Sequence, residues 1–548
     1  MIKRHFRILI ILILLPVLLL QGCWLPAHLN PARSAPQEPP ALFEPPEIVE
    51  TPADDEQPTP GQFTLRYEPQ FTMNPIRALN RDNIMLSSLL YESLFILTED
   101  LVAKPLLCAS WGTEDNITFT FEILPDIAMH DGSVMTVDDV VYSLRQAMNH
   151  QRSRHRSKLR GIESVNVDPE DENVIIITLE NPNARFIRLL DIPIIRAGTI
   201  DDNLPPGSGP YQFPHPEAMI LNRFSGYRHF LDMPLVRINL LECTDSDLTQ
   251  LFDSGELSLL WDDPAGAFDI RLNRPHEPRL YNTTALQYIG FNANSFALRN
   301  PDVRRAIGCA IERQYIVENI MNVPRSGQTV AAPATISPVF DLYDTQWENR
   351  GDLLWEMGAL LEQAGLADAF QDSFLAMPDG YGGFQRFELI FIVNIENSHK
   401  VAAANRIAEN LRLFGINVNV RALQWSDFME ALEEGRFDMY YGETLLGADF
   451  DFSPLLMPGD GNLNFGSTGN TAYRSLILAF LAASTVEEVR YAGEQLNLAV
   501  VQNAPFIPVL YKRYAIYTHM GAITDASPSQ SGIFHNFQDW SIDLLMLN

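Results

Sequence analysis

Residues 118–149 read TFTFEILPDIAMHDGSVMTVDDVVYSLRQAMN and carry three structural signals in order. Polar and apolar side chains alternate through the first six residues, which is the period of a strand with one buried face. His130-Asp131-Gly132 predicts a tight turn, since Asp favours turn entry and Gly tolerates a positive φ. Thr136 and Asp139 then form a weak capping box ahead of a helical apolar face. The stretch predicts a strand, a turn and a capped helix, as in many α/β modules.

This stretch resembles the signature of the oligopeptide/dipeptide/nickel-binding family of ABC-transporter solute-binding proteins. The family pattern is a tFtLR strand followed by kFHDGxxlTAxDVvySl, which here reads TFTFEI, MHDG and TVDDVVYSL. Residues 291–313 are similar to a second family signature, FNxxxxPfxdxrVRqAlxxAiDR. In that segment Pro301 at the helix start and Asp302 in the first turn are favourable for a helix in their own right.

Shorter segments resemble further motifs of the family in the expected order. They are the turn at 72–76, the helix at 84–95, PLLCASW at 105–111, PPGSGPY at 205–211, LNRFSGY at 221–227, DSGELS at 253–258, LLEQAG at 360–365, GRFDM at 435–439 and NAPFIPVL at 503–510. Residues 162–167 and 174–179 predict a hairpin. A strand at 387–393, a helix at 403–414 and a strand at 416–420 predict a βαβ unit and hence a parallel sheet.

The resemblance implies an α/β fold of the two-lobe, periplasmic-binding-protein-like type II class, with an extra small domain in the first lobe. Two crossings between the lobes, near 290 and 505, would act as a hinge. The expected boundaries are a signal peptide at 1–23, a tether at 24–61, a first lobe at 62–287 with its extra domain at about 83–195, a second lobe at 288–504, and a return to the first lobe at 505–548.

The N-terminus has the features of a secretory signal. Three basic residues precede an apolar run of about 13 residues, which is too short to span a membrane comfortably. Leu20-Gln21-Gly22-Cys23 resembles the bacterial lipobox, which implies that Cys23 is lipidated; Gln21 is unusual there, and an ordinary secretory signal or a short anchor stays open. The segment after Cys23 is rich in Pro and acidic residues, as expected of an extended tether.

The composition excludes several classes of protein. The formal net charge is -30, which argues against nucleic acid as a partner. One basic run, QRSRHRSKLR at 151–160, is interpreted as a solvated loop. The four cysteines form no CxxC motif, so the sequence predicts neither a metal site nor a disulfide framework. Motifs of hydrolases, nucleotide-binding proteins and zinc proteases are absent from the sequence, so we expect no catalysis and no cofactor; a lipid-anchored hydrolase is the rival class.

The resemblance also supplies candidate ligand-binding residues. LLGADFDF at 445–452 is similar to the family's gWxaDYxdP segment, in which the Asp pairs with the α-ammonium of a peptide; Asp449 takes that position and Phe450 replaces the Tyr. Leu446 replaces the Trp, so an aromatic wall is lost there. A surface acidic loop is the alternative interpretation of Asp449 and Asp451. The other candidates are Gly209, Tyr211 and Asn292.

These resemblances imply a monomeric, lipid-anchored solute-binding protein of an ABC importer. It would sit on the outer face of the cytoplasmic membrane or in the periplasm, capture an oligopeptide by hinge closure, and deliver it to the permease subunits. A sensor or pheromone receptor on the same scaffold, and a metal chelate or sugar as ligand, remain open. The sequence leaves undecided the ligand, the preferred peptide length and the type of bacterial envelope.

Overall fold

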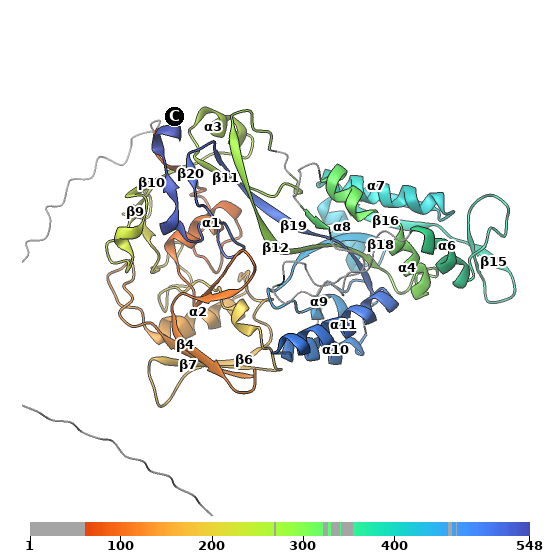
Figure 1. Ribbon diagram of the computed structural model, residues 1–548, viewed down its shortest axis with the longest axis horizontal. Coiled ribbons are helices and arrows are strands. Elements are labelled where there is room, and N and C mark those ends of the chain that lie inside the picture. The colour runs from red at the N-terminus through yellow and green to blue at the C-terminus, as the bar shows by residue number, and fades with distance from the viewer. Residues whose placement is uncertain are drawn as a thin grey trace, which may run out of the picture. The chain divides into compact units, whose positions relative to one another are not determined.

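The computed structural model describes residues 61–267, 270–321, 327–329, 340, 354–458, 463–466, 468 and 470–547 (Figure 1). The signal peptide, Cys23 and most of the predicted tether lie outside the described residues. We call the elements before β12, with the segment after β19, the first lobe, and the elements between these two strands the second lobe. The two strands are β12 (His276–Phe291) and β19 (Phe506–His519).

The first lobe contains two four-stranded sheets. One has the order β1-β10-β9-β8 and the other has the order β4-β5-β7-β6. The elements of the first lobe are β1 (Thr64–Arg66), α1 (Arg81–Leu90), β2 (Phe95–Leu97), β3 (Ala103–Pro105), β4 (Cys108–Thr113), β5 (Thr118–Ile123), α2 (Val137–Asn149), β6 (Ile162–Val167), β7 (Val174–Leu179), β8 (Tyr211–Gln212), β9 (Ile220–Arg223), β10 (Arg237–Leu241), α3 (Leu248–Ser254), β11 (Leu259–Asp262), β20 (Ile523–Thr524) and β21 (Ser541–Ile542).

The 118–149 stretch folds as its sequence predicts, into β5, a turn and α2. Side chains of β5 alternate between exposed and buried, and Gly132 has a φ of 81°. At the start of α2, the Asp139 carboxylate accepts hydrogen bonds from the Thr136 backbone N–H at 2.8 Å and from its hydroxyl at 2.9 Å. The predicted hairpin is confirmed as the antiparallel pair β6 and β7. These signals were sufficient because each depends only on neighbouring residues.

The second lobe shares one seven-stranded sheet with the first. Its main path is β11-β19-β12-β18-β16-β17, and β13 pairs with β19. The elements of the second lobe are α4 (Pro301–Cys309), α5 (Arg313–Tyr315), β13 (Gly327–Thr329), α6 (Leu354–Gln363), β14 (Ala376–Pro378), β15 (Phe384–Arg386), β16 (Leu389–Asn394), α7 (Ser398–Leu413), β17 (Val418–Leu423), α8 (Trp425–Glu433), β18 (Met439–Leu445), α9 (Ser453–Leu456), α10 (Tyr473–Ala482) and α11 (Val486–Asn503). The parallel pairing of β16 and β17 around α7 confirms the predicted βαβ unit.

The strands β12 and β19 run side by side from one lobe into the other (Figure 1). Near one end, Tyr281 and Ile516 are buried in the core that contains β1 and α1. Near the other end, Ile289 and Ile507 are buried in the core that contains α4, α7 and β16. A single antiparallel ribbon thus enters the cores of both lobes.

Candidate ligand-binding cleft

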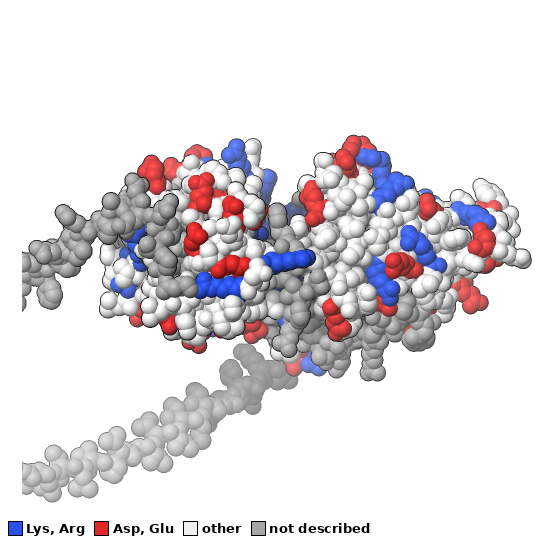
Figure 2. Space-filling model, turned by 90° about the horizontal axis from the view of Figure 1, so that it is seen from above, with Lys and Arg blue, Asp and Glu red and all other residues white. Residues whose placement is uncertain are grey.

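A cavity of about 1100 Å³ lies between the lobes. Residues of α1 and of the segments 154–162 and 179–193 line it from the first lobe, and residues 444–457 and 474–481 line it from the second. Figure 2 shows the surface notched between the lobes. The volume is slightly above the range of about 300–1,000 Å³ found for small-molecule sites. A ligand held there would contact both lobes at once.

Asp449 lies in the lining of this cavity and is buried. Its Oδ2 atom accepts a hydrogen bond of 2.8 Å from Nδ2 of Asn183, which belongs to the first lobe. Burial raises the pKa of the Asp449 carboxyl and the Asp451 carboxylate adds to this effect, while Asn183 and Arg185 favour the charged form. Asp449 therefore joins the lobes in this conformation.

Arg185 makes a second connection between the lobes. Its guanidinium donates to the carbonyl oxygens of Phe480 at 2.6 Å and Ala483 at 3.2 Å, and to the carbonyl oxygen of Asp449 at 3.4 Å. Phe480 is in the last turn of α10 and Ala483 is its C-cap, where helix carbonyls lack helical partners and the helix dipole favours a cation. The neighbouring Ala184 N–H donates to the Leu481 carbonyl at 2.8 Å. The lobes are thus held in contact by first-lobe donors at the end of a second-lobe helix.

Part of the basic run at 151–160 lines the cavity, which we did not expect from the sequence. It is a series of turns, as predicted, but Arg154, His155 and Lys158 line the cavity instead of an outer surface. Partial desolvation by the surrounding protein lowers the pKa of Arg154 to about 10 and also lowers that of Lys158. Arg154 is exposed, so the prediction of a solvated loop holds for it, whereas His155 is buried and Lys158 is half-buried. Their signal in the sequence was a concentration of cations in a strongly acidic chain.

Two acidic residues of the lining have cationic partners. Asp191 forms an ion pair with Lys158. Glu92 is buried and pairs with Arg228 at 2.6 Å, and it also accepts a hydrogen bond of 3.0 Å from the Ser208 hydroxyl. Their negative charge is therefore largely balanced by the protein itself.

Of the remaining predicted site residues, some line the cavity and others lie in the hydrophobic cores. Leu446 lies in the cavity lining, close to Asp449 in the sequence. Phe450 is buried, with a φ of 58°, in the apolar core of the second lobe. Tyr211 is buried in the first-lobe core, where its hydroxyl donates to the Leu235 carbonyl at 2.8 Å.

Gly209 and Asn292 serve close packing and loop structure. A Cβ atom at Gly209 would lie 2.4 Å from the Leu90 carbonyl carbon, so the motif glycine permits close contact with the end of α1. Asn292 donates to the carbonyl oxygens of Gly435 and Phe437 at 3.1 and 2.9 Å. Neither residue lies in the cavity lining, nor do Tyr211 and Phe450, so ligand contact by these four residues stays a prediction.

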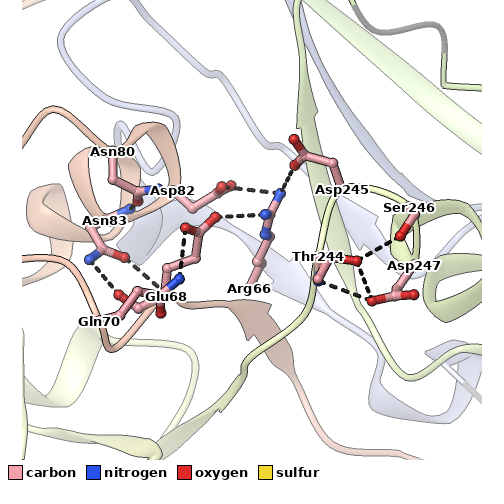
Figure 3. Close-up of polar contacts among 10 residues, drawn as sticks. All are labelled: Arg66, Glu68, Gln70, Asn80, Asp82, Asn83, Thr244, Asp245, Ser246 and Asp247. Atoms are coloured by element: carbon pink, nitrogen blue, oxygen red, sulfur yellow. Dashed lines mark hydrogen bonds and ion pairs between the residues drawn. The ribbon is translucent and has the colours of Figure 1, made fainter.

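A cluster of charges around Arg66 is separate from the cavity (Figure 3). The Arg66 guanidinium contacts the carboxylates of Glu68 at 2.6 Å, Asp82 at 3.3 Å and Asp245 at 2.6 Å. These residues connect β1 with α1 and with the loop after β10. The cluster therefore has a structural role, tying together the parts of the first lobe.

The described residues contain neither a cluster of metal ligands nor a helix suited to a membrane. No group of three or more His, Cys, Asp or Glu side chains in that part of the chain is placed to hold a metal ion. Within the same residues, no helix has the length and apolar character needed to cross a membrane.

Comparison with known proteins identifies the family of this chain. The family described as bacterial extracellular solute-binding proteins, family 5 (middle), matches residues 102–464. This chain belongs to that family. Heme-binding protein A of Haemophilus influenzae is 22% identical, and the match covers 74% of this chain and 79% of that protein. Dipeptide-binding protein DppE of Bacillus subtilis is 22% identical, and the match covers 81% of this chain and 84% of that protein.

Solved structures show the same fold. The substrate-binding protein CtaP of Listeria monocytogenes matches with a TM-score of 0.72, 18% identity and coverage of 88% of this chain and 98% of that chain. NikZ of Campylobacter jejuni, in complex with Ni(L-His), matches with a TM-score of 0.67, 18% identity and coverage of 88% and 100%. The family member thus has the type II periplasmic-binding-protein fold, and it is a solute-binding protein of ABC import.

Proposed function

We propose that this protein captures an oligopeptide in the cavity between its lobes, closes on it by bending at β12 and β19, and presents the closed form to an ABC permease. The observation that carries the proposal is the cavity itself, which is lined from both lobes while Asn183 and Arg185 hold the lobes in contact across it. A ligand that contacts both lobes favours the closed state by its differential affinity. No chemistry is done on the ligand.

Two observations favour a peptide as the ligand. Asp449 provides a buried carboxylate that matches the ammonium-binding position of the family motif. Among the similar proteins, DppE is named for dipeptides and the Salmonella typhi protein GsiB for glutathione. The replacement of the motif Trp by Leu446 means that the ligand has no indole ring to pack against at that point.

We further propose that the protein is a monomer anchored by lipid at Cys23 to the outer face of the cytoplasmic membrane. The support for the anchor is the lipobox-like sequence. One acyl chain binds a membrane only marginally, so the anchor would need more than one. Membrane fractionation of a Cys23→Ala variant tests the anchor, because firm membrane association at native size would contradict it.

Thermal unfolding with a panel of ligands tests the peptide assignment. A ligand that binds only the folded protein raises its melting temperature. We expect stabilisation by short peptides and none by oligosaccharides or metal chelates at equal concentration. Stabilisation confined to the chelates or sugars would replace peptide with that class.

A further inference from the structure

A buried cation lies at the irregular part of the ribbon that joins the lobes. Where the register of β12 and β19 shifts, residues 283–285 of β12 stand opposite the single residue Lys512 of β19. Lys512 is 2% exposed, and it does not belong to the lining of the cavity. Because a bulge is a place where paired strands can bend, Lys512 lies where rotation of the lobes is easiest.

Lys512 binds one carboxylate from each lobe. Its ammonium donates to Asp263, which immediately follows β11 of the first lobe, and to Glu443 of β18 in the second lobe, the latter at 2.9 Å. Burial alone would lower the pKa of Lys512, but the two carboxylates outweigh burial and raise it, so the ammonium is charged. One positive charge on the ribbon is therefore shared between the two lobes.

Without this cation the two carboxylates would repel each other. Burial raises the pKa of the Asp263 carboxyl, Lys512 lowers it, and Glu443 is near enough to raise it again. Glu443 has a second cationic partner in Lys400, at 2.9 Å, whereas Lys512 is the one cation among the described residues that pairs with Asp263. Removing the charge of Lys512 would thus leave a buried Asp263 carboxylate unpaired beside a carboxylate of the other lobe, which is costly.

We propose that Lys512 is a positioning residue for lobe closure, because its charge neutralises two carboxylates that belong to different lobes and would otherwise drive these lobes apart at the hinge. The inference rests on the closure step of the proposed function and deepens it, since it assigns control of that step to a residue outside the cavity. A protein that is closed for a smaller fraction of the time binds its ligand more weakly by that fraction.

Small-angle scattering of the ligand-free protein at pH 8 tests the proposal. Lys512→Gln keeps a hydrogen-bond donor but loses the charge, Lys512→Arg keeps the charge, and Lys512→Gln combined with Asp263→Asn also removes one of the opposing carboxylates. Asp263→Asn alone and Lys104→Gln are the controls, since Lys104 is an exposed cation of β3. Circular dichroism verifies that each variant is folded, and Lys512→Met takes the place of Lys512→Gln if the latter does not fold.

We expect Lys512→Gln to have a larger radius of gyration than the wild type. Lys512→Arg, Asp263→Asn, Lys104→Gln and the combined variant should have the wild-type radius, because none of them leaves two opposing carboxylates without a cation. An unchanged radius in Lys512→Gln would overturn the proposal. An equal increase in the combined variant or in Asp263→Asn would overturn it as well, because a lost hydrogen bond and not the charge would then open the lobes.

Peptide binding gives a second readout, which separates this proposal from the peptide assignment. In native mass spectrometry with a chymotryptic digest of casein, Lys512→Gln should bind peptides about tenfold more weakly than the wild type, and the combined variant should recover the wild-type affinity. Equal affinities of the wild type and Lys512→Gln would overturn the role of Lys512 and leave peptide capture standing. Failure of the wild type to bind the digest, with the scattering results as expected, would overturn peptide capture and support the role of Lys512.

Discussion

Asn183 and Asp449 are 266 residues apart in the sequence, and the amide of the first donates a 2.8 Å hydrogen bond to the carboxylate of the second. One residue belongs to the first lobe and the other to the second, so this bond exists only when the lobes meet. Asn183→Ala would leave the buried carboxylate without this partner, at a cost of about 1–3 kcal/mol to the closed state.

We therefore expect Asn183→Ala to weaken peptide binding by about tenfold or more in calorimetry. Asn173→Ala is the matched control, since Asn173 is an exposed residue at the β6–β7 turn of the same lobe. Identical affinities for the two variants would show that the interlobe bond contributes nothing to capture.

Asp449→Asn separates the charge of Asp449 from its role in holding the lobes together. The asparagine retains an oxygen that can accept from Asn183, so the variant loses the negative charge and only the long 3.4 Å hydrogen bond from the Asp451 N–H. If Asp449 meets a peptide ammonium, affinity should fall by about one to two powers of ten with little change in the melting temperature. Asp451→Asn is the control with the same change of charge. Equal, negligible losses of affinity in the two variants would remove Asp449 as an ammonium site.

Replacing Arg185 should shift the ligand-free protein toward an open conformation in which the lobes are further apart. Arg185→Met removes three hydrogen bonds to second-lobe carbonyls and one cation at the end of α10, which together stabilise the closed state by about 2–3 kcal/mol. We expect small-angle scattering of the ligand-free variant to give a larger radius of gyration than that of the wild type. Arg152→Met, at an exposed position of the first lobe, should give the wild-type value. A radius unchanged in Arg185→Met would contradict a holding role.

Glu443 should make stability depend on pH in the acid range. Burial opposes its ionisation, but Lys400 and Lys512, at 2.9 Å each, outweigh burial and lower its pKa to about 2. Because the folded pKa is below the unfolded value near 4.5, the stabilising contribution is complete above about pH 4.5 and is lost as the pH falls toward 2.

The measurement is urea unfolding of the wild type and Glu443→Gln between pH 6 and 2. The wild type should lose on the order of 3 kcal/mol relative to the variant across that range. Parallel pH profiles would show that the lysines do not hold this carboxylate ionised.

Local signals and long-range contacts differ in how well the sequence predicts them. The strand, turn and capped helix of 118–149 follow from alternation and from one Thr–Asp pair, all within 32 residues. The bond between Asn183 and Asp449 has no such signal, because it depends on where the whole chain brings two lobes together. Of the residues selected by motif resemblance, Asp449 and Leu446 lie in the cavity lining, whereas Gly209 packs against the end of α1.

The basic run at 151–160 shows a second limit of prediction from sequence. Residues 151–160 have no apolar period, so they predict a loop, and a charged loop is usually solvated on an outer surface. Whether its cations face bulk water or a cavity depends on the opposite lobe, and here Asp449 is close to Lys158. The informative feature was the contrast between this run and the acidic remainder of the chain.

The ribbon of β12 and β19 has a mechanical consequence. The two strands are paired from His276 with His519 to Gly290 with Phe506, and their register shifts between residues 282 and 288. Hydrogen bonds along such a pair resist sliding of one strand past the other, whereas bulges permit bending and added twist. The lobes can therefore rotate about this irregular segment but cannot translate along it. A ligand that draws the two cavity walls together by such a rotation would also change the angle between the lobes' outer faces.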